Sequence, residues 1–132
     1  MLQTAEDSLG ILRKEQEDTP ISCFAHGDYN QHNIIWVDTK WQIVNFENFI
    51  YHWSILDLAN YLRKMQEKNE WDIYVGSELL DSYTRVRSLS TSEQEKLYGL
   101  LLFPEKFWKV ANHYMNSRKT WVSEKDIDKL KR

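Results

Sequence analysis

Apolar residues recur at helical spacing along most of this chain, and a strand pattern occupies one short segment. Residues 4–16 predict a first helix, with its apolar positions set among charges. Pro20 ends that helix, because proline disfavours the helical conformation in the residue before it. A short apolar stretch, residues 21–25, then leads into a polar loop, residues 26–33.

The segment after the polar loop predicts a β-hairpin. Residues 34–37 are a continuous apolar run typical of a buried strand, and residues 38–40 supply a turn. Residues 41–46 are expected to return antiparallel to the first strand. This hairpin is the only β element that the pattern predicts.

Every later segment predicts helix. Ser54 and Asp57 resemble a capping box at the start of one helix, and residues 72–86 predict a second. The apolar positions expected on their buried faces are Ile55, Leu58, Leu62 and Met65 in the first, and Ile73, Val75, Leu79, Leu80 and Tyr83 in the second.

Two capping boxes compete for the start of the next helix. Ser90 with Glu93, or Ser92 with Glu95, would begin a helix that runs to about residue 102. Pro104 suits the first turn of a further helix, where its missing N–H costs nothing. A last, charged helix is expected from residue 123 to the end of the sequence.

Composition places the chain among ordinary globular proteins of one domain. It has 132 residues, of which 42% are apolar and 28% charged. Six tryptophans are many for this length, and burial in the core is the prediction for them. Aromatic residues left exposed would instead indicate a surface that binds a partner.

Charge and cysteine content exclude several classes of function. The formal net charge of −3 argues against a nucleic-acid binder, which needs a basic field. No apolar run approaches the roughly 20 residues that a membrane span requires, so no membrane partner is expected. Cys23 is the only cysteine, so an internal disulfide is impossible and a reducing, cytoplasmic location is expected.

Three polar residues around the hairpin match the needs of phosphoryl transfer. That reaction uses a carboxylate to orient the attacking hydroxyl, a side chain that holds Mg²⁺, and a second metal ligand near the phosphates. Asp28 and Asn33 lie in the loop before the hairpin, and Asn45 follows its second strand. A loop and a tight hairpin bring such positions together, so these side chains are predicted to converge on one site.

The same residues resemble the aminoglycoside phosphotransferase superfamily, whose signature is H-G-D-x-x-x-x-N followed by I-D-[WF]-[ED]. The matching segments are His26–Asn33 and Ile43–Glu47, and Asp57 matches a later D-L-A motif. Within the superfamily, the chain is most similar to CotS-like spore-coat proteins. Further segments that carry this likeness are Tyr61-Leu62-Arg63-Lys64, Glu70-Trp71, Phe103 to Trp108 and Ala111 to Tyr114.

The resemblance implies a fold that is mainly α with a small β-hairpin, the C-terminal lobe of a protein-kinase-like fold. We expect a single lobe over residues 1–132, with the catalytic-type loop and hairpin at about 21–47 and a helical subdomain at about 54–132. The ATP-clamping N-lobe is expected to be absent, because no glycine-rich loop or strand lysine precedes residue 21.

The family pattern also implies roles for individual residues. Asp28 descends from a catalytic base, and His26 beside it orients the loop by hydrogen bonding or takes part in catalysis. Asn33 and Asn45 would bind the Mg²⁺–ATP cofactor of the full-length family, with Asn33 alternatively capping the loop. Asp57 would steady the loop.

Position 45 is where the sequence departs from the family pattern. Asn45 stands where the family has a metal-bridging aspartate, so it is a weak ligand or a cap at the strand end. Glu47 is a weak candidate for an acidic ligand, with surface charge as the other interpretation. Binding of Mg²⁺ and ATP by this chain alone is therefore not expected.

Two functional classes stay open. One is a non-catalytic module associated with the spore coat, which keeps the motif for folding and binds other coat proteins. The other is part of an active phosphotransferase that acts on a small-molecule hydroxyl once an N-lobe is supplied. A homodimer is a further open interpretation.

Two other sites are weighed against simpler interpretations. Cys23, His26, His32 and His52 do not have the spacing of a structural zinc site. Trp108, Tyr114 and Trp121 are predicted to be core residues, with the lining of an acceptor pocket as the alternative.

Overall fold

A computed structural model describes residues 1–14, 20–116 and 124–131 of the chain. Its helices are α1 (Leu2–Arg13), α2 (Ile55–Lys68), α3 (Ile73–Val86), α4 (Thr91–Leu102), α5 (Glu105–Asn116) and α6 (Glu124–Lys131). Its strands are β1 (Ser22–Ala25), β2 (Ile34–Val37), β3 (Lys40–Ile43) and β4 (Ile50–Trp53). The architecture is therefore mainly helical with small β elements, as the sequence predicts.

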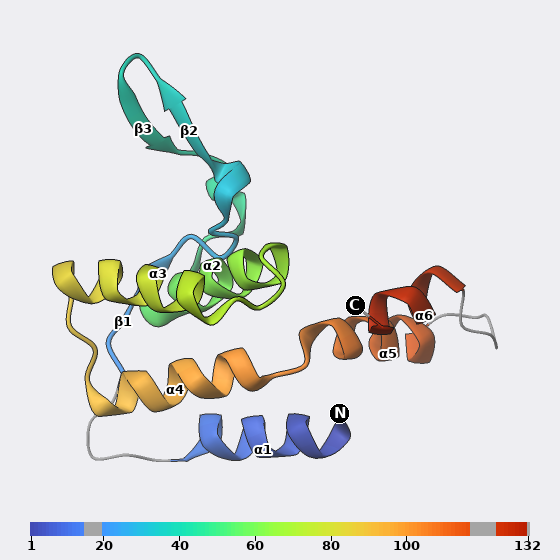
Figure 1. Ribbon diagram of the computed structural model, residues 1–132. Helices are drawn as coiled ribbons and strands as arrows, with labels where there is room; N and C mark the ends of the chain where they lie inside the picture. Colours follow the sequence, from blue (N-terminus) through green and yellow to red (C-terminus); the bar gives the residue numbers. More distant parts are fainter. Residues whose placement is uncertain (15–19, 117–123, 132) are drawn as a thin grey trace.

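Helices α1 to α4 pack in a stack, and α5 packs with α6. Helix α1 lies along α4, α4 packs on α2, and α2 packs on α3 (Figure 1). The buried core residues are Ile55, Leu58, Ala59 and Leu62 of α2 together with Leu97 of α4. This is the face of α2 that the helical spacing predicts.

Two antiparallel pairs make up the β structure. Strand β2 pairs with β3, with Ile34 opposite Ile43 and Trp36 opposite Trp41, which is the predicted hairpin. Strand β1 pairs with β4, with Phe24 opposite Tyr51, and the sequence pattern did not predict this pair. Figure 1 shows the β2–β3 hairpin projecting from the helical stack.

The capping predictions have mixed outcomes. Ser90 and Glu93 form a full capping box at the start of α4, so the first of the two alternatives is correct. Ser54 makes no capping hydrogen bond at α2, so the predicted box there is wrong. The Asp57 carboxylate instead accepts backbone N–H groups from the polar loop. Residues 15–19 and 117–123, which include Trp121 and Ser123, lie outside the described part of the chain.

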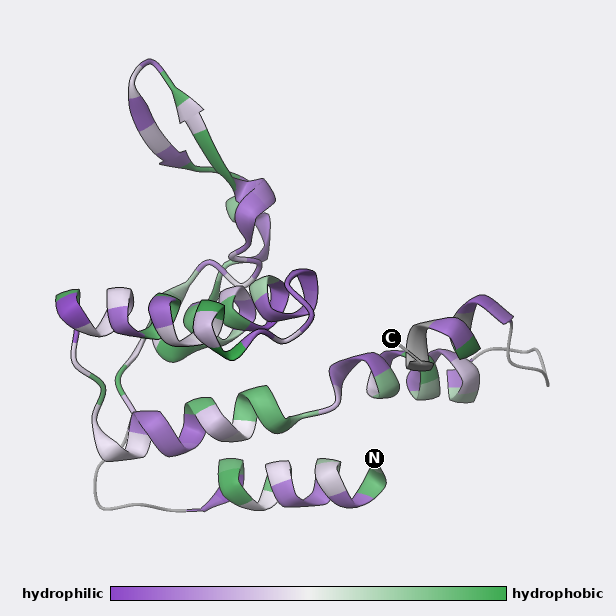
Figure 2. Ribbon diagram, in the orientation of Figure 1, coloured by the Kyte–Doolittle hydropathy of each residue, from purple (hydrophilic) through white to green (hydrophobic). Residues whose placement is uncertain are grey.

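The burial predicted for several large side chains is wrong. Trp36 and Trp41 are 59% and 69% exposed, because no helix in the described part of the chain packs against the hairpin (Figure 1). Trp71 and Trp108 are also more than half exposed, and Ile73 at the start of α3 is 75% exposed. Figure 2 shows hydrophobic residues along β2 and at the end of α4.

Candidate functional site

Residues before and after the polar loop in the sequence hold it in place. It follows the buried Ala25 at the end of β1. The backbone N–H of His26 donates to Asp57 Oδ2 at 2.6 Å, and the N–H of Gly27 donates to Asp57 Oδ1 at 3.0 Å. Asp57 therefore ties the loop to the first turn of α2, which is the position that the family resemblance implies for a supporting residue.

Gly27 is required by the geometry of this turn. Its φ of +80° lies in the left-handed region, and a Cβ built there would meet the carbonyl oxygen of Asn48 at 2.1 Å. Both features exclude a side chain at this position without a shift of the backbone. The loop and the segment after β3 are thus packed backbone against backbone.

His26 is buried, and both of its ring nitrogens have partners. Nε2 lies 2.8 Å from the carbonyl oxygen of Val44, and Nδ1 accepts the backbone N–H of Asp28 at 3.3 Å. Because Nδ1 accepts, Nε2 carries the hydrogen that it donates to Val44. The ring of Phe46 packs at 4.6 Å between centroids. This arrangement favours the orienting role over proton transfer, and the role stays a prediction.

The side chains of Asp28, Asn33 and Asn45 lie together, joined by hydrogen bonds. Asn33 Nδ2 donates to the Asp28 backbone oxygen at 2.8 Å and to Asp28 Oδ2 at 3.2 Å. Asn45 Nδ2 donates to Asn33 Oδ1 at 2.8 Å. The backbone N–H of Val44 also donates to the backbone carbonyl oxygen of Asn33 at 3.0 Å. The predicted convergence on one point is therefore present, although the catalytic and ligand roles stay predictions.

Sequence reasoning missed two members of this cluster. Asn30 is buried, and its Nδ2 donates to Asp28 Oδ1 at 3.0 Å while its Oδ1 accepts the His32 backbone N–H at 2.9 Å. An asparagine directly before a short turn is a known sequence signal, because its side chain can bond the backbone two residues further on. Tyr29 packs against Tyr61 of α2 with 5.5 Å between ring centroids. Burial raises the pKa of Tyr29 above its ordinary value, and the nearby Tyr61 and Asp57 raise it further.

The structure addresses one of the two roles weighed for Asn45, the cap, and its role as a metal ligand stays a prediction. It has a left-handed backbone with φ of 63° and makes no capping hydrogen bond at the 3₁₀ turn Phe46–Asn48 that follows. Its amide turns to Asn33 instead. Glu47 is exposed in that 3₁₀ turn.

The residues of this cluster do not fit a magnesium ion as they are arranged. Mg²⁺ prefers carboxylate oxygens, and Asp28 is the one carboxylate in the hydrogen-bonded cluster. Asn45 presents an N–H donor to Asn33, and a donor cannot ligate a cation. Among residues 1–14, 20–116 and 124–131, no group of three or more His, Cys, Asp or Glu side chains is placed to hold a metal. That finding also covers Cys23, His26, His32 and His52.

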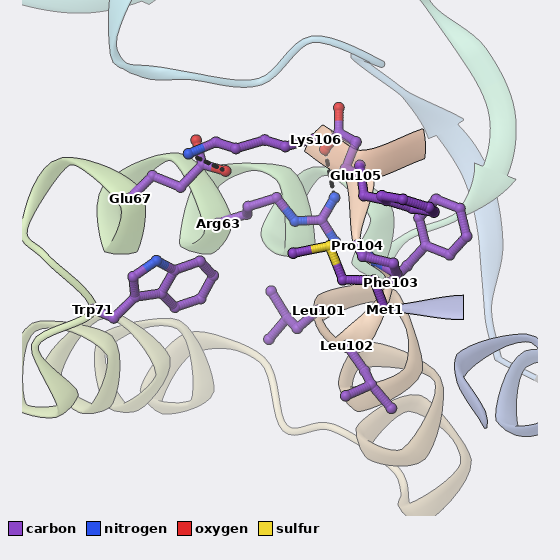
Figure 3. A pocket seen from close by; sticks show the side chains of 11 residues that line it. Met1, Arg63, Glu67, Trp71, Leu101, Leu102, Phe103, Pro104, Glu105 and Lys106 are labelled. Carbon is purple, nitrogen blue, oxygen red and sulfur yellow. Dashed lines mark hydrogen bonds and ion pairs between the residues drawn. The ribbon is translucent and has the colours of Figure 1, made fainter. Parts of the chain in front are cut away.

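A concavity apart from the polar loop lies between α2 and the α4–α5 junction (Figure 3). It has a volume of ≈ 250 Å³ and is lined by Trp71, Phe103 and Pro104 together with two ion pairs, Arg63–Glu105 and Lys106–Glu67. The charged side chains that line it therefore pair with one another. None of the predicted loop residues lines it. Trp108 borders a separate depression on α5, beside Asn112 and His113.

The fold is shared with solved phosphotransferases. An aminoglycoside phosphotransferase from Alicyclobacillus acidocaldarius matches with a TM-score of 0.80 and 20% identity, over 98% of this chain and 40% of that chain. The amicoumacin kinase hAmiN, solved in complex with AMP-PNP, Ca²⁺ and Ami, matches with a TM-score of 0.66 and 16% identity, over 99% of this chain and 41% of that chain. The chain thus spans about two fifths of the length of both structures. Fold and loop together define the C-terminal lobe of a protein-kinase-like, aminoglycoside-phosphotransferase fold.

The family follows from the sequence match. The model of the family described as "Spore coat putative kinase YutH" matches residues 6–132, and the chain belongs to this family. The resemblance to CotS-like spore-coat proteins is thereby confirmed. No curated protein matches the chain. No helix in the described part of the chain is both long and apolar enough to cross a bilayer.

Proposed function

We propose that this chain works at the spore coat as a kinase-like module that does not catalyse phosphoryl transfer by itself. Its catalytic-type loop serves as a folding element that organises the β1–β4 pair, the hairpin and α2. The family description supports the spore-coat association. The cytoplasm is the proposed location before assembly at the coat.

The observation that carries this proposal is the state of the Asp28 carboxylate. One of its oxygens accepts from Asn30 and the other from Asn33. A catalytic base has to accept the proton of an attacking hydroxyl, and here both carboxylate oxygens already accept hydrogen bonds from side-chain amides of the loop. These hydrogen bonds hold the loop in one conformation, which favours a structural role.

The exposed aromatic residues support a role in assembly. Phe24 and Tyr51 lie opposite each other on the β1–β4 pair, with 5.5 Å between ring centroids, and are 72% and 65% exposed. Phe49 extends the group, 6.0 Å from Phe24. Contiguous exposed aromatic side chains of this kind favour protein–protein contact. Other coat proteins are the proposed partners, with an N-lobe or a second copy of the chain as alternatives.

The second candidate is a lobe of an active phosphotransferase. It is favoured by the fold match to two phosphotransferases, one of them solved with AMP-PNP and Ca²⁺. In that case Asp28 would act as the base toward a small-molecule hydroxyl, and an N-lobe would hold ATP.

A phosphoryl-transfer assay of the full natural polypeptide distinguishes the non-catalytic module from the active phosphotransferase. We expect phosphate release from Mg²⁺-ATP to be the same for the natural sequence, for Asp28→Asn and for the control Asp38→Asn in the hairpin turn. Mg²⁺-ATP at millimolar concentration should leave the melting temperature unchanged, because only a bound ligand raises it. A rate that falls about 100-fold or more in Asp28→Asn alone would establish the active phosphotransferase instead.

A further inference from the structure

We propose that the Asn45 amide takes the place of a divalent cation in this loop, so that the loop keeps its shape without Mg²⁺. The inference rests on the proposed function, because it explains how a loop of the kinase type is held together as a purely structural element. It also assigns position 45 a specific task, which is to donate one hydrogen bond to Asn33.

The direction of that hydrogen bond is fixed by Asp28. Asn33 faces two oxygens of Asp28, the backbone carbonyl and Oδ2, and both are acceptors. Asn33 must therefore turn its NH₂ group toward Asp28 and its Oδ1 toward position 45. A group 2.8 Å from Oδ1 has to be a hydrogen-bond donor or a cation, and the Asn45 Nδ2 group is a donor.

Burial makes this bond necessary. Asn33 is only 5% exposed, so an unpaired Oδ1 would lose its water without gaining a partner. Asn45 reaches it from a left-handed backbone, which asparagine adopts more easily than most residues. The Val44 N–H bond to the Asn33 backbone holds the two segments in register. Backbone and side chain thus join position 33 to the end of the hairpin.

An aspartate at position 45 would reverse the situation. Its carboxylate would face the Asn33 oxygen, acceptor against acceptor, and would add a second negative charge to that of Asp28. A cation placed between that carboxylate and the Asn33 oxygen would relieve the repulsion, because carboxylate and amide oxygens are ligands that Mg²⁺ accepts. The variant Asn45→Asp should therefore exchange a metal-independent loop for a metal-dependent one.

Thermal unfolding of the full chain in EDTA and in Mg²⁺, without nucleotide, tests the inference. The natural sequence should melt at the same temperature in both. Asn45→Asp should melt about 3–5 °C lower in EDTA, from the lost bond and the added repulsion, and should recover most of that loss in millimolar Mg²⁺. Asn48→Asp, the same change at an exposed position of the neighbouring 3₁₀ turn, should show neither effect.

The other outcomes overturn the inference. A Mg²⁺-dependent rise for the natural sequence would mean that the site takes the metal as it stands. An unchanged melting temperature for Asn45→Asp in EDTA, or a loss that Mg²⁺ does not restore, would mean that the amide does not replace a cation.

A second measurement needs no variant and holds even if Asn45→Asp fails to fold. In NMR spectra of the natural chain, substoichiometric Mn²⁺ should not selectively broaden the side-chain NH₂ signals of Asn33 and Asn45, and selective broadening would refute the inference. Neither experiment contains ATP, so a result that overturns this inference does not affect the proposed absence of catalysis. Phosphoryl transfer that depends on Asp28 would overturn the proposed function separately.

Discussion

The carboxylate of Asp57 binds the backbone of His26, 31 positions earlier in the sequence, through an N–H···O hydrogen bond of 2.6 Å. Its other oxygen accepts the N–H of Gly27. The first turn of α2 therefore holds the start of the catalytic-type loop, and the loop shape depends on a side chain that lies beyond the hairpin and β4.

Removing the Asp57 carboxylate should loosen the loop. We expect Asp57→Ala to lower the free energy of unfolding by about 2 kcal/mol, because two backbone N–H groups lose a charged acceptor. Asp57→Asn keeps one acceptor oxygen and should lose about half as much. Urea denaturation measures the change, and Asp81→Ala on the exposed side of α3 is the control, expected to stay within about 0.5 kcal/mol. Equal losses in Asp57→Ala and Asp81→Ala would contradict an anchoring role.

Two glycines should respond in opposite directions to the same substitution. Gly27→Ala places a Cβ 2.1 Å from the Asn48 oxygen at a φ of +80°, so we expect a loss of about 2 kcal/mol or more. Gly10→Ala lies within α1 with no atom near its Cβ, and should gain about 0.5–1 kcal/mol from higher helix propensity. Denaturation of both variants in parallel checks the pair. A stabilised Gly27→Ala would show that the loop relaxes easily.

The local sequence pattern predicted those structural elements whose interacting residues lie close together in the sequence. The β2–β3 hairpin and the α4 capping box are set by residues within a few positions of one another, and both are present. The β1–β4 pair escaped prediction because each strand has four residues and its partner lies far along the sequence, from 25 positions for Ala25 and Ile50 to 31 for Ser22 and Trp53. Strands that short carry little periodicity of their own.

Tertiary contacts overrode local signals in other places. Ser54 and Asp57 have the spacing of a capping box, yet the loop takes the Asp57 carboxylate. Ile73 has the helical spacing of a core residue but begins α3 beyond the edge of the core. The convergence of Asp28, Asn33 and Asn45 followed from the motif. The direction of the Asn45 amide did not, because it depends on how Asn33 meets Asp28.

Lys96 joins α1 to the rest of the lobe. It is 4% exposed, and its Nζ donates to the carbonyl oxygens of Ile11, Leu12 and Lys14 at the end of α1, at 3.0, 2.9 and 2.6 Å. These carbonyls have no partner within the helix, so the lysine acts as a cap from α4. The charge also favours the negative end of the helix dipole.

Replacing this lysine should release α1. We expect Lys96→Met, which keeps most of the side-chain volume, to lower the free energy of unfolding by about 2–3 kcal/mol. Amide hydrogen exchange should speed up most in α1, because that helix loses its cap. Lys64→Met on the exposed side of α2 is the matched control and should change neither quantity. An equal increase in the amide exchange rate throughout the lobe of Lys96→Met would argue against a local capping role.

Glu93 should make the stability of the lobe depend on pH. It is 2% exposed and bonds to Arg87 and to the Ser90 backbone N–H. Burial alone would raise its pKa, but the hydrogen bonds from Arg87 and from the backbone lower the pKa below the ordinary 4.5. The unfolded chain then binds a proton more readily than the folded one. The stability that Glu93 contributes is fully present above pH 4.5 and is lost as the pH falls through the folded-state pKa.

The variant Glu93→Gln separates this term from general acid denaturation. At neutral pH it should be less stable than the natural sequence, because the charged bond to Arg87 is lost while Arg87 keeps its charge. Between neutral pH and about pH 3.5 its free energy of unfolding should fall less steeply, because one depressed carboxyl has been removed. Urea denaturation across that range gives both quantities, with Glu78→Gln on the exposed side of α3 as control. If Glu93→Gln and Glu78→Gln had the same slope, the pairing with Arg87 would contribute nothing to the acid sensitivity of the lobe.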